Sequence, residues 1–208
     1  MIHMKEFDYR ALEKIEESVL KKVVGTTRSC SRHLLYLELG MIPARFQIQP
    51  QVLNFLQYLL KQPEKSILYK VFEALKNHPI KNDWLNCAKE TLKQFEIYLT
   101  IKEIQEMKCT HFKSLVKKQA TKAAFKYLQQ KQENGKKGKT IVYEQIQMAD
   151  YLLPECTLSV SDKIDMFAFR CEMNDLPDNF GQSKMHELQC HTLMDNEHLL
   201  NCSHLKQG

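Results

Sequence analysis

The sequence predicts an all-α protein: an irregular multi-helix bundle followed by a poorly ordered C-terminal tail that contains His and Cys. Apolar residues recur at helical spacing through most of the 208 residues. Only six glycines and six prolines occur, too few turn residues for a many-stranded sheet protein. The 43% hydrophobic content is enough to build a core. We therefore expect a helical domain over 1–174 and a separate tail over 175–208.

The stretch from Ser31 to Leu60 is expected to organise the bundle. Ser31 is a suitable N-cap for a short apolar helix, and Gly40 is placed to end that helix in a left-handed conformation. The helix that follows Pro43 is apolar on most sides, as expected for a helix in the middle of a bundle. Pro50 has no amide hydrogen and would clash with a preceding helical turn, so it predicts a kink or a fresh helix start.

Helical spacing also predicts a helix before this stretch and another after it. The first spans 7–24, and its inward-facing residues are expected to be Leu12, Ile15, Val19, Leu20 and Val23. The next begins at Pro63, and its inward-facing residues are expected to be Ile67, Leu68, Val71, Phe72 and Leu75.

Later helices have recognisable starts. Thr100 and Glu103 have the spacing of a capping box, in which each side chain satisfies a backbone amide of the other residue. The longest helix is expected over 111–133, followed by a loop over 134–139 with two glycines and three lysines. We expect a further helix over 143–152 and a last one from Ser161.

Composition and charge exclude several classes of protein. No run of eighteen apolar residues occurs, which excludes a membrane span, and the N-terminus lacks the apolar run of a secretory signal. Seven cysteines, an odd number, argue for reduced thiols rather than a disulfide framework. We expect an intracellular protein, either nuclear or cytoplasmic.

The most pronounced charge pattern is a lysine-rich stretch. Nine lysines occur from 113 to 139 against one acid, Glu133. Phe112, Val116, Ala120, Ala123 and Tyr127 should form the apolar face of this helix, and three of the lysines lie in a row at i, i+4 spacing. Like charges at that spacing repel each other, and a phosphate backbone would relieve the repulsion. The other interpretation is an ordinary solvated face. The candidate phosphate contacts are Lys113, Lys117, Lys118, Lys122 and Lys126, with Lys136, Lys137, Lys139 and Arg45 in support.

The tail has a pattern typical of a metal site. His186, Cys190, His198 and Cys202 give the spacing H-x3-C-x7-H-x3-C, and four N/S ligands suit tetrahedral zinc. The alternative is a tail that binds no metal. Apart from this zinc, the sequence predicts no cofactor and no small-molecule substrate.

Several motifs, taken in order, resemble a known family. LLYLELGMIPARF followed by LNFLQYLL resembles the segment just after the polymerase domain of LINE-type, non-LTR retrotransposon reverse transcriptases. The resemblance extends over nearly the whole chain. It continues through NDW (82–84), FKSLVKK (112–118), AAFKYL (123–128), YLLPE (151–155) and EHLLNC (197–202).

The resemblance implies a thumb-like or linker-like, nucleic-acid-binding fragment of a truncated open reading frame. It would grip template–primer or target DNA through the lysine-rich helix, with RNA or DNA backbone as partner and the polymerase domain supplied elsewhere. The family's zinc knuckle has a second cysteine, and Leu193 stands near its place, so the knuckle is degenerate. No two aspartates are adjacent, so the paired catalytic carboxylates of a polymerase are absent and we expect no enzyme activity. The alternative is an inactive all-α remnant or protein-interaction module.

Overall fold

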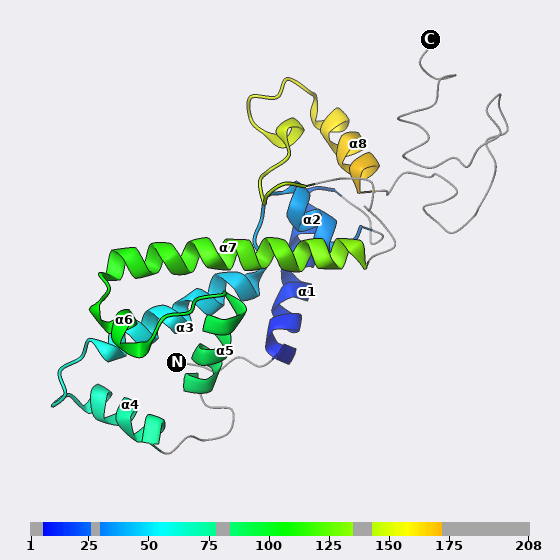
Figure 1. Ribbon diagram of the computed structural model, residues 1–208. Helices are drawn as coiled ribbons and strands as arrows, with labels where there is room; N and C mark the ends of the chain where they lie inside the picture. The colour runs from blue at the N-terminus through cyan, green and yellow to red at the C-terminus, as the bar shows by residue number, and fades with distance from the viewer. Residues whose placement is uncertain (1–5, 26–29, 78–83, 135–142, 172–208) are drawn as a thin grey trace, which may run out of the picture. The chain divides into compact units, whose positions relative to one another are not determined.

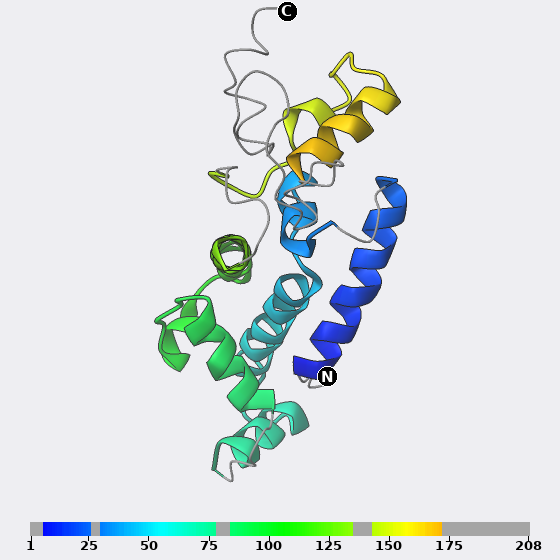
Figure 2. The same ribbon diagram turned by 90° about the vertical axis from the view of Figure 1, so that its right-hand side faces the viewer.

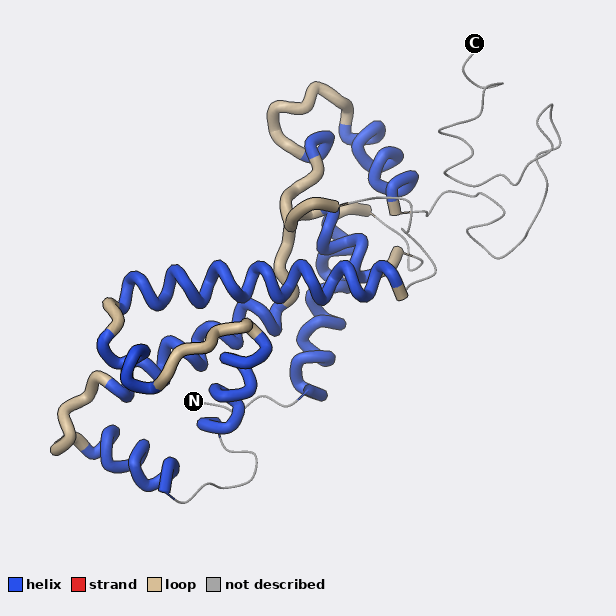
Figure 3. The backbone as a smooth tube through the Cα atoms, in the orientation of Figure 1, coloured by secondary structure: helices blue, strands red, loops and turns tan. Residues whose placement is uncertain are grey.

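The computed structural model describes residues 6–25, 30–77, 84–134 and 143–171, and within these ranges it shows helices connected by loops (Figures 1 and 3). The helices are α1 (Glu6–Val23), α2 (Arg32–Glu38), α3 (Ala44–Leu60), α4 (Ile67–Asn77), α5 (Trp84–Gln94), α6 (Ile101–Glu106), α7 (Cys109–Glu133), the 3-10 helix η1 (Asp150–Leu152) and α8 (Val160–Arg170). Within the described ranges the only β-type pairing is an isolated bridge between Leu39 and Met148. The expected all-α class is confirmed. No helix in these ranges combines the length and apolar character needed to cross a membrane.

The chain divides into two compact units. The first comprises Met1–Glu16 and Ile42–Tyr127, and the second comprises Glu17–Met41 and Leu128–Gly208. The division falls inside the stretch expected to organise the bundle, so α2 belongs to the second unit and α3 to the first. The expected boundary between 174 and 175 lies outside the described residues.

Helix α3 forms the centre of the first unit. It packs against α4, α5 and α6 (Figure 2). Its buried apolar side chains are Phe46, Val52, Leu53, Leu56, Leu59 and Leu60. The buried amide of Gln57 donates to the carbonyls of Ile104 and Met107 at 3.0 and 2.9 Å, and so satisfies the C-terminal end of α6.

Helix α3 continues through Pro50 without interruption, so the predicted fresh helix start is wrong. A proline inside a helix removes one backbone hydrogen bond and costs about 3 kcal/mol. Burial of Phe46 on one side and Leu53 on the other offsets this cost, because each fully buried apolar side chain contributes about 2 kcal/mol.

Helix α1 presents a different face to the protein from the one its apolar spacing predicts. The buried residues are Tyr9, Glu13 and Leu20. Glu13 pairs with Arg45, and the Glu16 carboxylate accepts from the Ala44 amide at 3.0 Å, at the N-terminus of α3. An acid is stabilised beside a helix N-terminus, so these polar contacts decide which face turns inward. The residues expected inward but found exposed are Leu12, Ile15, Val19 and Val23.

Helix α4 begins at Ile67, four residues after the expected start at Pro63. Of its apolar residues only Phe72 is buried. Ile67, Leu68 and Val71 are 79%, 42% and 53% exposed, which corrects their assignment to the core.

The second unit is built on α2. Leu34, Leu35, Tyr36 and Leu37 are fully buried, and Gly40 ends the helix with a φ of +64°, as predicted. Ser31 occupies the N-cap position, but its side chain makes no capping hydrogen bond.

The segment 143–152 is not the helix that was expected. It runs along the C-terminal end of α2, where Met148 pairs with Leu39 and the Ala149 amide donates to the Glu38 carbonyl at 2.9 Å, before the short helix η1. Tertiary contacts with α2 here outweigh the helical spacing of Ile146 and Met148.

The capping box at α6 is confirmed. The Glu103 amide donates to the Thr100 hydroxyl at 3.2 Å, and the Thr100 amide donates to the Glu103 carboxylate at 2.7 Å. Thr100→Ala should therefore lower the free energy of unfolding by about 1 kcal/mol. Urea denaturation followed by the fluorescence of Trp84, the single tryptophan, measures this loss in the first unit. Thr110→Ala is the matched control, because the exposed Thr110 side chain has no hydrogen bond among the described residues. Equal losses in the two variants would contradict the prediction.

Candidate nucleic-acid interface

The lysine-rich part of α7 has one buried face. Its residues follow one another every four positions: Phe112, Val116, Ala120, Ala124 and Leu128, each at most 3% exposed. The predicted face included Ala123 and Tyr127, which are instead half-buried. A strict spacing of four drifts slowly around an α-helix, so the buried face winds along α7 instead of running straight.

The lysine row follows the same winding path on the other side of the helix. Lys118, Lys122 and Lys126 each lie two positions from the buried residues before and after them, which is about 200° around the helix. All three are exposed. The three lysines therefore all lie opposite the buried face, from one end of the row to the other. Lys113 and Lys117 are also exposed and follow buried residues by one position, about 100° away.

The positive charge of this face is mostly unneutralised. Among the described residues, no carboxylate pairs with Lys113, Lys117, Lys118 or Lys122. Lys126 pairs with Glu96 at 3.1 Å, but the two side chains are 67% and 60% exposed. An ion pair this exposed contributes about 0–1 kcal/mol, so a phosphate can displace Glu96 at little cost. We call these five lysines the lysine face.

Four further residues were expected to support the phosphate contacts of the lysine-rich helix. Lys136, Lys137 and Lys139 lie outside the described residues. Arg45 does not belong to the lysine face: its side chain is 11% exposed, it pairs with Glu13, and its guanidinium lies 5.3 Å from the centre of the Tyr127 ring. Arg45 is held inside the first unit by Glu13 and Tyr127, which corrects its assignment as a phosphate contact.

The predicted zinc ligands His186, Cys190, His198 and Cys202 also lie outside the described residues. Within the part of the chain that the structure describes, no group of three or more His, Cys, Asp or Glu side chains is placed to hold a metal ion. The zinc site stays a prediction.

The structure reveals one polar cluster that the sequence reasoning missed. The fully buried Glu38 carboxylate accepts from the hydroxyl of Tyr143, from the hydroxyl of Tyr151 at 2.8 Å and from Nε of Arg170 at 2.7 Å. One carboxylate thus joins α2, the segment 143–152 and α8. The signal was present in the sequence, because Glu38 is the only charged residue in LLYLELGMI and a buried carboxylate needs partners.

Burial, and then the charge of Glu38, raise the pKa of Tyr143 and Tyr151 well above the usual range of tyrosine, so both hydroxyls stay protonated donors. Burial opposes the charge of Arg170, but its hydrogen bond to Glu38 and their attraction outweigh this effect and raise its pKa. The cluster is therefore a neutralised ion pair with two fixed hydroxyl donors.

Two thiols lie in the same unit as this cluster. Cys30 and Cys171 are both buried. The hydrogen bond with Cys30, and then burial, raise the pKa of Cys171, so this thiol is protonated and unreactive while the second unit is folded.

No family model, curated protein or solved structure matches this chain.

Proposed function

We propose that this chain is a non-catalytic nucleic-acid-binding module that grips the phosphate backbone of RNA or DNA through the lysine face of α7. The observation that carries the proposal is the row of exposed lysines opposite the buried face. Four of the five lysines in the lysine face have no carboxylate partner among the described residues. Lysines position a protein on phosphates without reading bases, so binding should be indifferent to sequence.

The resemblance to the region after the polymerase domain of LINE-type reverse transcriptases supports a more specific role. In that role the chain holds a template–primer or target duplex, while the polymerase domain that does the chemistry is supplied elsewhere. Counterion release would make the binding steeply dependent on salt, with dissociation constants of about 1–100 μM at physiological ionic strength.

Charge reversal of the lysine row tests the proposal. A variant with Lys118→Glu, Lys122→Glu and Lys126→Glu should bind a labelled RNA–DNA hybrid at least about tenfold more weakly, because three phosphate contacts become repulsive. The slope of log K against log salt should become shallower by about 2 to 3, since each lost contact removes nearly one unit. Fluorescence anisotropy at 50, 100 and 200 mM salt measures both quantities.

A second charge-reversed variant is the matched control. Lys65, Lys70 and Lys76 are exposed on or beside α4 and have no carboxylate partner among the described residues. Reversing these three changes the net charge by the same amount. The proposal fails if the two triple variants lose the same affinity, or if the unmodified chain shows no salt-dependent binding.

A second function is favoured by the apolar surface of α4. Ile67, Leu68 and Val71 are exposed on one short helix, and exposed apolar side chains that lie together are typical of protein interfaces. The alternative is a protein-interaction module whose apolar surface meets a polymerase domain. Light scattering separates the two functions: self-association that Ile67→Lys and Val71→Lys abolish, without hybrid binding, would favour the alternative.

A further inference from the structure

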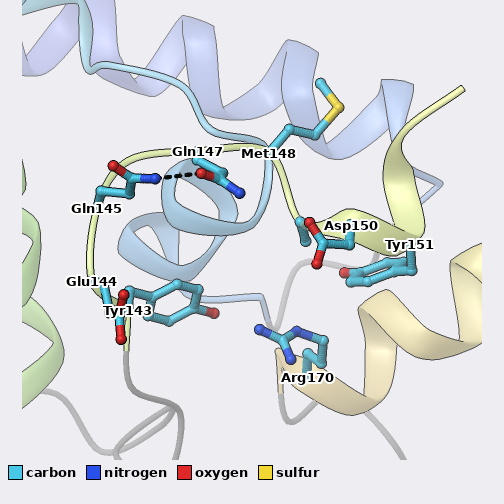
Figure 4. A pocket seen from close by; sticks show the side chains of 9 residues that line it. Tyr143, Glu144, Gln145, Gln147, Met148, Asp150, Tyr151 and Arg170 are labelled. Atoms are coloured by element: carbon cyan, nitrogen blue, oxygen red, sulfur yellow. Dashed lines mark hydrogen bonds between the residues drawn. The ribbon is translucent and has the colours of Figure 1, made fainter. Parts of the chain in front are cut away.

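A cleft of about 530 Å³ lies in the second unit, between the segment 143–152 and the C-terminal end of α8 (Figure 4). Its polar and aromatic lining includes Tyr143, Gln145, Gln147, Asp150, Tyr151 and Arg170. Pockets of this size hold one small organic molecule or one nucleobase. The lysine face belongs to the first unit, so the cleft is a separate feature of the molecule.

One wall of the cleft offers an unused pair of hydrogen-bond donors. Nε of Arg170 is bound to Glu38, but the two terminal amino groups of the guanidinium have no acceptor among the described residues. The guanidinium carbon lies 5.9 Å from the centres of the Tyr143 and Tyr151 rings, and these contacts, together with the bond to Glu38, fix its orientation. Figure 4 shows the guanidinium between the two phenol side chains. A planar guanidinium held in this way binds a matching pair of acceptors with little loss of entropy.

Another wall offers an unused acceptor. Asp150 is exposed at the start of η1, and its carboxylate has no donor among the described residues. Asp150 and Arg170 line the same cleft, and Figure 4 shows them on either side of the Tyr151 hydroxyl.

The charges around the cleft decide between classes of ligand. Glu38 neutralises Arg170, while Asp150 and Glu144 add two negative charges to the lining. This balance disfavours a free phosphate, because two carboxylates would repel it. A simple cation would pair with Asp150 and leave the donors of Arg170 unused. The best match is a neutral, planar ring that carries neighbouring acceptors and donors.

We propose that this cleft binds one unpaired guanine base. Its O6 and N7 would accept from the two terminal amino groups of Arg170, the commonest pairing of arginine with a base. Its N1–H and N2–H would donate to the carboxylate of Asp150. Adenine presents an amino donor beside N7 and has no N1–H, and the pyrimidines have no N7. The cleft therefore adds base recognition to a chain whose lysine face reads only phosphates, and either proposal can fail without the other.

A set of single-stranded RNAs tests this inference on the full chain. The probes are nine-nucleotide uridine tracts with guanosine, adenosine, inosine or 7-deazaguanosine at the centre, titrated by fluorescence anisotropy at low salt. Guanosine should bind at least about tenfold more tightly than adenosine. Inosine lacks the N2 amino group and 7-deazaguanosine lacks N7, so each should lie between the two. Equal affinities across the set, or no binding of any probe, would overturn the inference.

Two variants assign the preference to the cleft. Asp150→Asn should reduce the preference for guanosine without changing hybrid binding, because the amide has one acceptor oxygen in place of two while the pairing with Arg170 remains. Glu144→Gln is the matched control, since Glu144 lines the same cleft and should leave the preference unchanged. A preference that Asp150→Asn leaves unchanged places the base elsewhere and overturns the inference. Reversing the lysine row should weaken the binding of all four probes by the same factor, so the ratio of guanosine to adenosine affinity should stay constant. Loss of overall affinity therefore tests the lysine face, and the ratio tests the cleft.

Discussion

Glu38→Ala should lower the free energy of unfolding of the second unit by about 3 kcal/mol. The substitution leaves the Arg170 guanidinium without its carboxylate, and the hydroxyls of Tyr143 and Tyr151 without their acceptor. A buried donor that loses its partner keeps its full desolvation cost. The expected loss is at the lower end of the range for broken buried pairs, because the Arg170 side chain is 32% exposed and can recover some hydration.

Alkylation of Cys30 and Cys171 measures this loss where it occurs. Both thiols are buried in the second unit, so the rate at which they react reports how often that unit opens. Peptide mapping by mass spectrometry separates them from the other five cysteines. Glu144→Gln is the control, since this exposed acid lies on the same segment, and its effect should stay within about 0.5 kcal/mol. Unchanged alkylation in Glu38→Ala would show that the carboxylate does not hold the unit together.

Gly40→Ala is the second substitution with a large expected effect, a loss of about 2–5 kcal/mol. The φ of Gly40 is +64°, which side chains other than glycine rarely adopt. In addition, a β-carbon at this position would lie 2.2 Å from the Met148 amide nitrogen and 2.6 Å from the Gln147 carbonyl carbon. These are backbone atoms and cannot rotate away, so the bridge between Leu39 and Met148 has to open.

Gly25→Ala separates the two causes of this loss. Gly25 has nearly the same φ, +66°, but a β-carbon there meets only the Ile164 side chain at 3.8 Å. Its expected loss is therefore the conformational cost alone, about 1–2 kcal/mol. The difference between the two variants, measured by urea denaturation and by alkylation of Cys171, gives the contribution of the close approach. Equal losses would show that the clash is relieved without opening the bridge.

The sequence predicted those parts of the fold that depend on neighbouring residues. The capping box at Thr100, the left-handed conformation of Gly40 and the buried leucines of α2 all follow from local spacing. The buried face of α1 could not be predicted from local spacing, because it depends on the contact between Glu13 and Arg45, thirty-two positions later. The helix predicted over 143–152 was wrong for the same reason, because the conformation of this segment is set by Glu38 and Gly40, which are distant in sequence.

One of the two candidate sites could be predicted from local spacing, and the other could not. A lysine face on one helix can be read from spacing, and the structure places all five lysines on the exposed side of α7. The cleft brings together Tyr143, Asp150 and Arg170 from separate segments, and no spacing rule connects them. Arg45 was misassigned because its partners come from α1 and α7, which are distant from it in sequence.

The dimensions of α7 set a minimum length for any duplex that uses the whole lysine face. An α-helix rises about 1.5 Å per residue, so Lys113 and Lys126 are about 20 Å apart along the axis. Base pairs are stacked about 3.4 Å apart, so this distance corresponds to about six of them. Affinity should therefore increase with duplex length up to about that size, and each base pair beyond it should add only the statistical gain of more overlapping positions.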